Sequence, residues 1–169
     1  MDADETGIIV AGKDDQERAW VLADASGRYP PTEWAKTAIA AYRAHRADRI
    51  VAEVNHGGEM VEATLRVIDP NVPFAAVCAS RGKVARAEPV AALYEQGRVH
   101  HIGAFPQLED QMCGFAPAGD DAALGLRSAG RSPDRVDALV WALTDLLLEP
   151  MPDQGIYDLY RQLAHKARS

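Results

Sequence analysis

Three carboxylates lie at positions where a charged side chain is unusual and indicates a possible functional site. Glu53 closes the apolar run 50–52, and a carboxylate at the end of a buried strand is costly unless it is paired or bound to a metal. Asp134 and Asp137 lie three residues apart at the start of a predicted helix, so their side chains share one helix face. Brought together, the three would form an oxygen-rich site suited to Mg²⁺ or Mn²⁺.

Such a site has a definite chemistry. Two divalent ions about 3.5–4 Å apart can activate water and stabilise the leaving oxygen in phosphodiester hydrolysis. We therefore expect Glu53, Asp134 and Asp137 to be catalytic metal ligands in a two-metal site. Each also has an ordinary alternative: Glu53 could face solvent or an arginine, and acids in a first helical turn cap free N–H groups and complement the helix dipole.

Other motifs carry less chemistry. The segment 7–14 matches G-x-x-x-x-G-K, but Asp14 stands where a P-loop needs Ser or Thr, and the segment is itself strand-like. His100 and His101 are adjacent on a short predicted strand, so their rings point to opposite faces and are expected to be structural or at the surface. Cys78 and Cys113 lack metal-ligand spacing and are expected to be reduced, packed thiols.

Composition and length set the limits. The 169 residues hold 18 Lys and Arg against 25 Asp and Glu, a net charge of −7, with 47% hydrophobic residues. This suits one globular domain, placed at 1–150, followed by a tail segment, 151–169. No apolar stretch is long enough to span a bilayer and the N-terminus is acidic, so we expect a cytoplasmic protein with no membrane partner.

The elements that must position the carboxylates follow an α/β pattern. Apolar runs at 7–11 and 19–23 predict a β-hairpin, followed by a helix over 32–45 and a strand over 49–54, buried on both faces. A helix through 60–68, a strand over 72–79, a helix over 84–96, a strand over 99–102 and a helix over 106–113 come next. The Gly- and Ala-rich segment 114–131 predicts a mobile loop, and a long helix begins at Ser132 or Pro133.

Four segments, in order, resemble one known family. They are Ile50-Val-Ala-Glu53-Val-Asn-His-Gly-Gly58, Ser80-Arg-Gly-Lys83-Val-Ala-Arg86, Glu95-Gln-Gly97-Arg-Val99 and Ser132-Pro-Asp134-Arg-Val-Asp137-Ala-Leu. In this order they look like the nuclease domain of the large terminase subunit of tailed phages, prophages and gene transfer agents. The resemblance runs from about Glu5 to Leu148.

The resemblance implies a ribonuclease H-like fold, a mixed sheet flanked by helices, and metal-dependent endonuclease action on double-stranded DNA during packaging. It places Glu53 on the fourth strand and Asp134 with Asp137 at the start of the last helix, and it makes Mg²⁺ or Mn²⁺ the cofactor. Lys83 and Arg86, with Arg81 nearby, would contact phosphate. The family's partners are a packaging ATPase domain and the portal protein, in the cytoplasm of a bacterial host, and further copies of the same chain could join them.

One departure accompanies the resemblance. The family's first catalytic Asp lies on a first strand upstream of the stretch that resembles residues 3–7, and we expect this strand to be missing here. Its absence would expose unpaired strand edges and impair activity. Two alternatives follow: a non-catalytic remnant that binds DNA or the portal, and a resolvase-like nuclease that cuts branched DNA.

Overall fold

The predicted β-hairpin opens the fold. The computed structural model describes residues 5–30, 32–54, 59–80, 82–115 and 134–148. Strand β2 (Ile9–Lys13) pairs antiparallel with β3 (Ala19–Asp24), with a register shift between Val10 and Ala11. The hairpin turn is closed by Asp14, whose carboxylate accepts hydrogen bonds from three residues of the turn and of β3.

Two further pairings extend this hairpin. The two-residue strands β1 (Glu5–Thr6) and β4 (Gly27–Arg28) pair antiparallel beyond its open end, and neither was predicted. Strand β7 (Val99–His101) runs parallel to β3 on the other side, so the order β2-β3-β7 forms a mixed three-stranded sheet. The mixed sheet expected from the sequence is therefore present in this half of the molecule.

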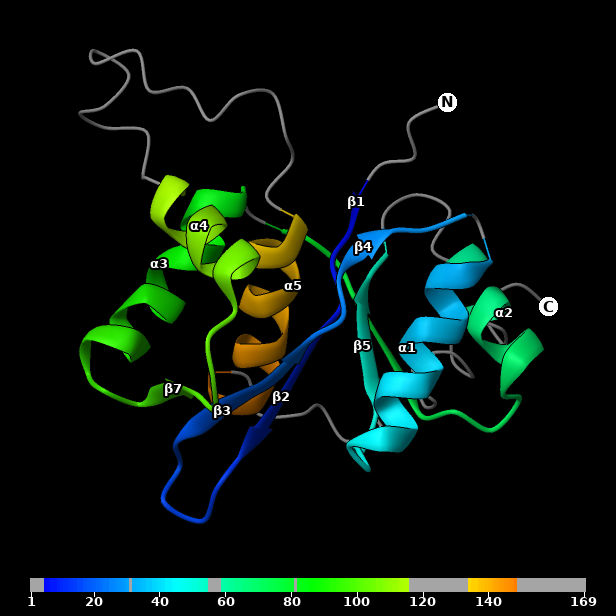
Figure 1. Ribbon diagram of the computed structural model, residues 1–169, viewed down its shortest axis with the longest axis horizontal. Coiled ribbons are helices and arrows are strands. Elements are labelled where there is room, and N and C mark those ends of the chain that lie inside the picture. Colours follow the sequence, from blue (N-terminus) through cyan, green and yellow to red (C-terminus); the bar gives the residue numbers. More distant parts are fainter. Residues whose placement is uncertain (1–4, 31, 55–58, 81, 116–133, 149–169) are drawn as a thin grey trace, which may run out of the picture.

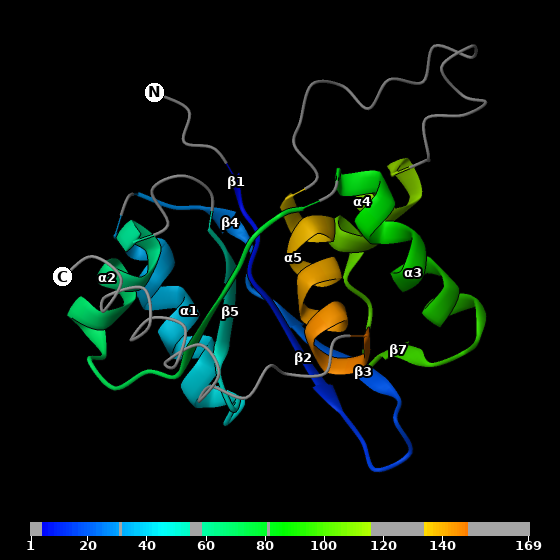
Figure 2. The same cartoon turned by 180° about the vertical axis from the view of Figure 1, so that it is seen from behind.

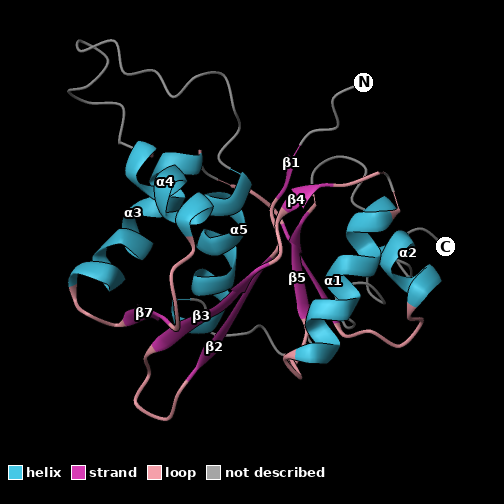
Figure 3. Cartoon of the chain, in the orientation of Figure 1, coloured by secondary structure: helices cyan, strands magenta, loops and turns pink. Residues whose placement is uncertain are grey.

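The second half is a β-α-β unit preceded by a helix. Helix α1 (Glu33–Ala44) leads into β5 (Ile50–Glu53), and α2 (Glu59–Ile68) connects β5 to its parallel partner β6 (Phe74–Val77). A parallel pair needs such a crossover connection, which explains why a helix lies between the two strands. Figure 3 shows α1 and α2 beside β5, on the side away from the hairpin.

Three helices cover the mixed sheet. These are α3 (Lys83–Glu95), α4 (Pro106–Gly114) and α5 (Asp134–Leu143), and α5 passes into a π-helical turn at Thr144–Leu148. The sequence predicted one continuous helix to Leu147, so the π-helical turn is a difference. Within it, Asp145 pairs with Arg49 at 2.7 Å, which ties the end of this helix to the start of β5.

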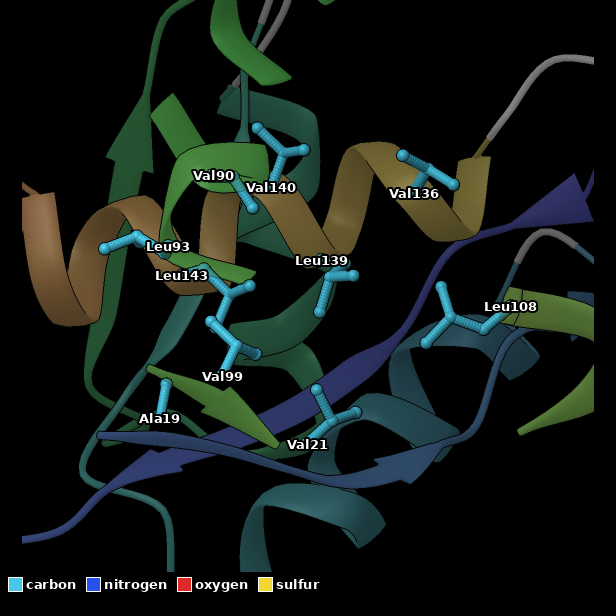
Figure 4. Packing of buried hydrophobic residues seen from close by; sticks show 10 residues of the cluster. All are labelled: Ala19, Val21, Val90, Leu93, Val99, Leu108, Val136, Leu139, Val140 and Leu143. Carbon is cyan, nitrogen blue, oxygen red and sulfur yellow. The ribbon is translucent and has the colours of Figure 1, made fainter. Parts of the chain in front are cut away.

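The apolar side chains form two separate cores. In the first, α5 packs against α3, α4 and the mixed sheet, as Figure 4 shows. In the second, α1 and α2 pack against the β5–β6 pair. The first core contains Ala19, Val21, Val90, Leu93, Val99, Leu108, Val136, Leu139, Val140 and Leu143, and the second contains Ala35, Ile39, Leu65, Val72 and Phe74.

A cavity of about 890 Å³ lies between the two halves, and we call it the interstrand gap. It is bordered by β2 on one side and β5 on the other, with residues of α1 and α5 lining it. In the described part of the chain, β2 pairs only with β3, and β5 pairs only with β6. Figures 1 and 2 show that β2 and β5 run in opposite directions along this gap, with α5 beside β2.

The gap corrects one expectation. The strand over 49–54 was predicted to be buried on both faces, yet every residue of β5 is only half-buried. The physical reason is that one edge of β5 borders the gap instead of another strand. The cysteines differ as well, because Cys78 and Cys113 are both exposed thiols and not packed ones.

Several predictions lie outside the described residues. These are positions 116–131 of the mobile loop predicted over 114–131, the helix start at Ser132 or Pro133, Arg81 and the tail segment 151–169. Among the helices that the structure describes, none has the length and apolar character needed to cross a membrane.

Candidate active site

Glu53 lies at the carboxyl end of β5, where the strand meets the interstrand gap. Its Oε2 accepts a hydrogen bond of 2.7 Å from Nε1 of Trp141 on α5. The same oxygen lies 3.4 Å from a guanidinium nitrogen of Arg86 on α3. The carboxylate is thus partnered by two elements, as its position on an apolar strand requires.

Asp134 and Asp137 occupy the first turn of α5, as predicted, and both line the gap. Asp137 is bound on each oxygen: Oδ1 lies 2.9 Å from Arg86 and Oδ2 lies 2.7 Å from Nζ of Lys83. Asp134 is half-buried at the helix start. Glu53 and Asp137, which are far apart in the sequence, are therefore brought to the same guanidinium group.

Arg86 is the centre of this arrangement. Its side chain is only 10% exposed, and its guanidinium carbon lies 4.8 Å from the centroid of the Trp141 ring. Its Nε is buried and has no hydrogen-bond partner among the described residues. We call the group the Arg86 cluster, and it consists of Glu53, Lys83, Arg86, Asp137 and Trp141.

The structure places two of the predicted DNA-binding residues inside this cluster. Lys83 and Arg86 contact carboxylates from the first turn and a half of α3. Lys83 remains partly exposed, at 42% of its side chain, whereas Arg86 is almost covered. Phosphate contact by these residues stays a prediction, and Arg81 lies outside the described residues.

The donor chemistry suits a hard divalent cation. Glu53, Asp134 and Asp137 offer only carboxylate oxygens, the ligands that Mg²⁺ and Mn²⁺ prefer. The present arrangement neutralises two of the three carboxylates with cationic side chains. Among the described residues, no three acidic, histidine or cysteine side chains converge on a common point.

Two residues of α5 were missed by the reasoning from sequence. Trp141 lies four residues after Asp137, a spacing that places both on one helix face and could have been noticed. Arg135 is buried, at 6% of its side chain, and bridges Glu5 of β1 and Asp24 of β3 at 2.9 and 2.8 Å. No local pattern marks Arg135, because its partners lie more than 100 residues earlier.

The two histidines behave as predicted. His100 stacks on Trp20, with ring centroids 4.7 Å apart. His101 points the other way, where Nδ1 lies 3.0 Å from Glu109 and Nε2 lies 2.8 Å from the hydroxyl of Tyr94. The contact with His101 is the main cause that lowers the pKa of Glu109, whereas burial raises the pKa of Tyr94. Neither imidazole joins the Arg86 cluster.

Comparison with known proteins adds one match. A family model described as a terminase RNaseH-like domain matches residues 1–146, a span that includes both carboxylate-bearing elements. Neither the curated proteins nor the solved structures contain a significant match.

Proposed function

The chain belongs to the terminase RNaseH-like domain family, and from this premise we propose that it is a metal-dependent endonuclease domain of a DNA-packaging terminase. Its substrate would be double-stranded DNA, in which it hydrolyses phosphodiester bonds. The proposal rests on one observation. Glu53 of β5 and Asp137 of α5, which are far apart in the sequence, both contact the guanidinium group of Arg86.

Glu53, Asp134 and Asp137 are the residues that would hold Mg²⁺ or Mn²⁺, as the ligands of a two-metal site. A bound divalent cation supplies Lewis-acid activation and charge neutralisation for phosphodiester hydrolysis. The protein's own contribution is positioning: the Trp141 N–H orients the Glu53 carboxylate, and the rigid first turn of α5 holds both aspartates on one face.

Lys83 and Arg86 would bind the phosphate backbone. Lys83 is the better placed of the two, because its side chain is partly exposed at the start of α3. A phosphate that approaches the cluster competes with Asp137 for these cations, and binding it would release that carboxylate. Arg81, which lies outside the described residues, is also proposed to contact phosphate.

The wider setting follows from the family and is also proposed. The partners would be double-stranded DNA, a packaging ATPase domain and the portal protein, in the cytoplasm of a bacterial host. A homo-oligomer is compatible with this setting.

The test is nicking of supercoiled plasmid in Mg²⁺ or Mn²⁺. We expect nicking by the unmodified chain and a loss of about 100-fold or more in Glu53→Gln. Glu62→Gln is the matched control, because Glu62 is paired with Arg66 on α2 and does not line the gap, so that variant should nick normally.

A second function is supported by the ion pairs that neutralise Glu53 and Asp137. These pairs would also suit a non-catalytic domain that binds DNA or the portal. Absence of nicking at every Mn²⁺ concentration, with DNA binding retained, would identify this alternative. Faster cleavage of four-way junctions than of linear duplex would instead identify a resolvase-like enzyme.

DNA binding is tested separately from cleavage, by fluorescence anisotropy over a series of salt concentrations. Lys83→Gln should weaken binding to all sequences and reduce the slope of log affinity against log salt by about 1. Lys36→Gln, which alters an exposed lysine paired with Glu33 on α1, should leave the slope unchanged. Equal slopes for both variants and the unmodified chain would remove Lys83 from the DNA-binding surface.

A further inference from the structure

Arg86 joins two of the carboxylates that the proposed function assigns to a metal. One nitrogen of its guanidinium group, Nη2, lies 2.9 Å from Oδ1 of Asp137 and 3.4 Å from Oε2 of Glu53. A Mg²⁺ ion lies about 2.0–2.1 Å from each ligand oxygen. An ion held by these two oxygens must therefore lie beside both of them, which is where the positively charged Nη2 is placed.

The same carboxylates have further partners. Oδ2 of Asp137 lies 2.7 Å from Nζ of Lys83, so each oxygen of this carboxylate contacts a cation. A divalent ion that binds Asp137 takes the place of one of these cations, because like charges a few ångströms apart in a half-buried site repel strongly. Since Arg86 also contacts Glu53, its displacement would free an oxygen on both carboxylates.

The buried position of Arg86 is only partly satisfied. Its side chain is 10% exposed, and its Nε has no hydrogen-bond partner among the described residues. A buried N–H without an acceptor costs free energy that contact with water would restore. The two carboxylates and the Trp141 ring, whose centroid lies 4.8 Å from the guanidinium carbon, offset this cost. Loss of the carboxylates to another cation would therefore favour release of the side chain toward solvent.

The backbone of Arg86 can stay in place while its side chain moves. The residue lies near the start of α3, where its amide N–H donates to the carbonyl oxygen of Gly82 at 3.1 Å. Lys83, one turn earlier on the same face of the helix, has a side chain that is 42% exposed, so this face reaches solvent. Rotation about the side-chain bonds of Arg86 can thus carry the guanidinium group to water while its apolar stem stays packed.

We propose that Arg86 is an internal counter-cation that competes with the divalent ion for Glu53 and Asp137, and that its guanidinium group leaves both carboxylates when the ion binds. This inference rests on the proposed function, because it concerns the same carboxylates. Arg86 then sets the concentration of Mg²⁺ at which the site fills, since the free energy of metal binding must exceed that of the contacts it replaces. The released guanidinium group is available to a DNA phosphate, the ligand predicted for it.

The first measurement follows Arg86 by NMR in the unmodified full chain as Mg²⁺ is added. The Nε–H proton of Arg86 is buried and should exchange slowly with water before the addition. We expect Mg²⁺ to speed this exchange by about 10-fold or more and to shift the signal of the Trp141 indole N–H, which donates to Glu53. The matched control is Nε–H of Arg49, which donates to Asp145 outside the cluster and should keep its exchange rate.

The second measurement is the affinity for Mg²⁺, determined by isothermal titration calorimetry. Arg86→Met keeps an apolar stem and removes the competing charge, so it should bind Mg²⁺ about 10-fold more tightly than the unmodified chain. Lys83→Met is the charge-matched control and should gain less, because the charge it removes is more exposed and better screened by water. Equal gains in the two variants would reduce the effect to net charge and overturn the inference.

Two further results separate this inference from the proposed function. If Mg²⁺ shifts the Trp141 signal but leaves the exchange at Arg86 unchanged, the guanidinium group stays in place; the inference then fails and the metal site stands. If the Trp141 signal moves neither in the unmodified chain nor in Arg86→Met, the inference and the metal site fail together. The NMR measurement needs no variant, so it decides the inference even if Arg86→Met does not fold, and neither readout depends on nuclease activity.

Discussion

At the scale of single residues, the placement of Arg86 is the most informative feature. The guanidinium group of Arg86 lies beside two carboxylates and over an indole ring. The negative charges of the carboxylates and the π-electrons of the ring both stabilise this buried cation. Burial in this position leaves Nε of Arg86 without a hydrogen-bond partner among the described residues, which is unfavourable. The candidate site is thus held in a neutralised form by one of the residues predicted to bind DNA.

Gly7 gives a residue-scale prediction. A Cβ at Gly7 would collide with the backbone carbonyl of Asp134 and lie 3.0 Å from the Cβ of Ala138, so only glycine allows the chain to pass α5 at this point. We expect Gly7→Ala to lower the free energy of unfolding by about 1–3 kcal/mol, measured by urea unfolding.

Gly12 supplies the matched control. A Cβ at Gly12 would meet only Cδ1 of Leu22, at 3.5 Å, which is an ordinary contact. Gly12→Ala should therefore change the free energy of unfolding by less than about 1 kcal/mol. Equal effects of the two substitutions would contradict the close approach of Gly7 to α5.

At the same scale, the sequence indicates which residues are unusual but not what they contact. The spacing of Asp134 and Asp137 predicted a shared helix face because helix geometry is local. Gly7 lies close to the small side chain of Ala138, although the two residues are far apart in the sequence. The pairing of Asp137 with Arg86 depends on how α3 docks against α5, which no local spacing records.

At the scale of elements, buried Arg135 anchors α5 to strands β1 and β3. Arg135→Met should lower the free energy of unfolding by about 3–5 kcal/mol, because it leaves Glu5 and the almost covered Asp24 without their shared cation. Urea unfolding measures this loss.

The control for Arg135 is an exposed ion pair of similar length. Arg43 lies 2.8 Å from Asp69, but 61% of its side chain is exposed. Arg43→Met should therefore cost at most about 1 kcal/mol. A loss at Arg135 no larger than that at Arg43 would show that the Arg135 pairs do not anchor the helix.

The β2–β3 hairpin should weaken at low pH. The hydrogen bond from Trp20, followed by the one from the Arg18 backbone, holds the pKa of Asp14 well below its ordinary value of 3.8. Because the folded pKa is the lower one, this stabilisation is present above pH 3.8 and is lost as the pH falls through the folded pKa. The loss of stability on acidification should thus be smaller in Asp14→Asn than in the unmodified chain.

The measurement is urea unfolding at about pH 6 and about pH 3 for each variant. Asp15→Asn is the control, since Asp15 is an exposed neighbour outside the hydrogen bonds of the turn. An equal loss on acidification in Asp14→Asn and Asp15→Asn would exclude the turn as a source of the pH dependence.

At the scale of the whole molecule, the two cores should respond separately to damage. Leu65→Ala in the second core and Leu139→Ala in the first should each cost about 2–5 kcal/mol. Because no described strand of one sheet pairs with the other across the gap, we expect Leu65→Ala to speed hydrogen exchange in β5 and β6 while β3 and β7 keep their protection. A uniform rise in exchange would show that the two halves open as one unit.

The α/β class, the hairpin and the order of the long elements were predictable, because apolar periodicity is local. The two-residue strands β1 and β4 were not, since they form only where Glu5–Thr6 meets Gly27–Arg28. The separation of β5–β6 from the mixed sheet could not be predicted from periodicity either, because the apolar run Ile50–Ala52 has the same pattern whether its outer edge pairs with a strand or borders a gap.

The anchoring by Arg135 has a mechanical consequence. Arg135 stands directly after Asp134 and two residues before Asp137, and its other end grips Glu5 and Asp24. A pull on the polypeptide at Glu5 would reach the carboxylate-bearing turn of α5 by two side chains, Arg135 and Gln111, rather than through the body of the sheet. A displacement of β1 would therefore be transmitted over a short distance to Asp134 and Asp137.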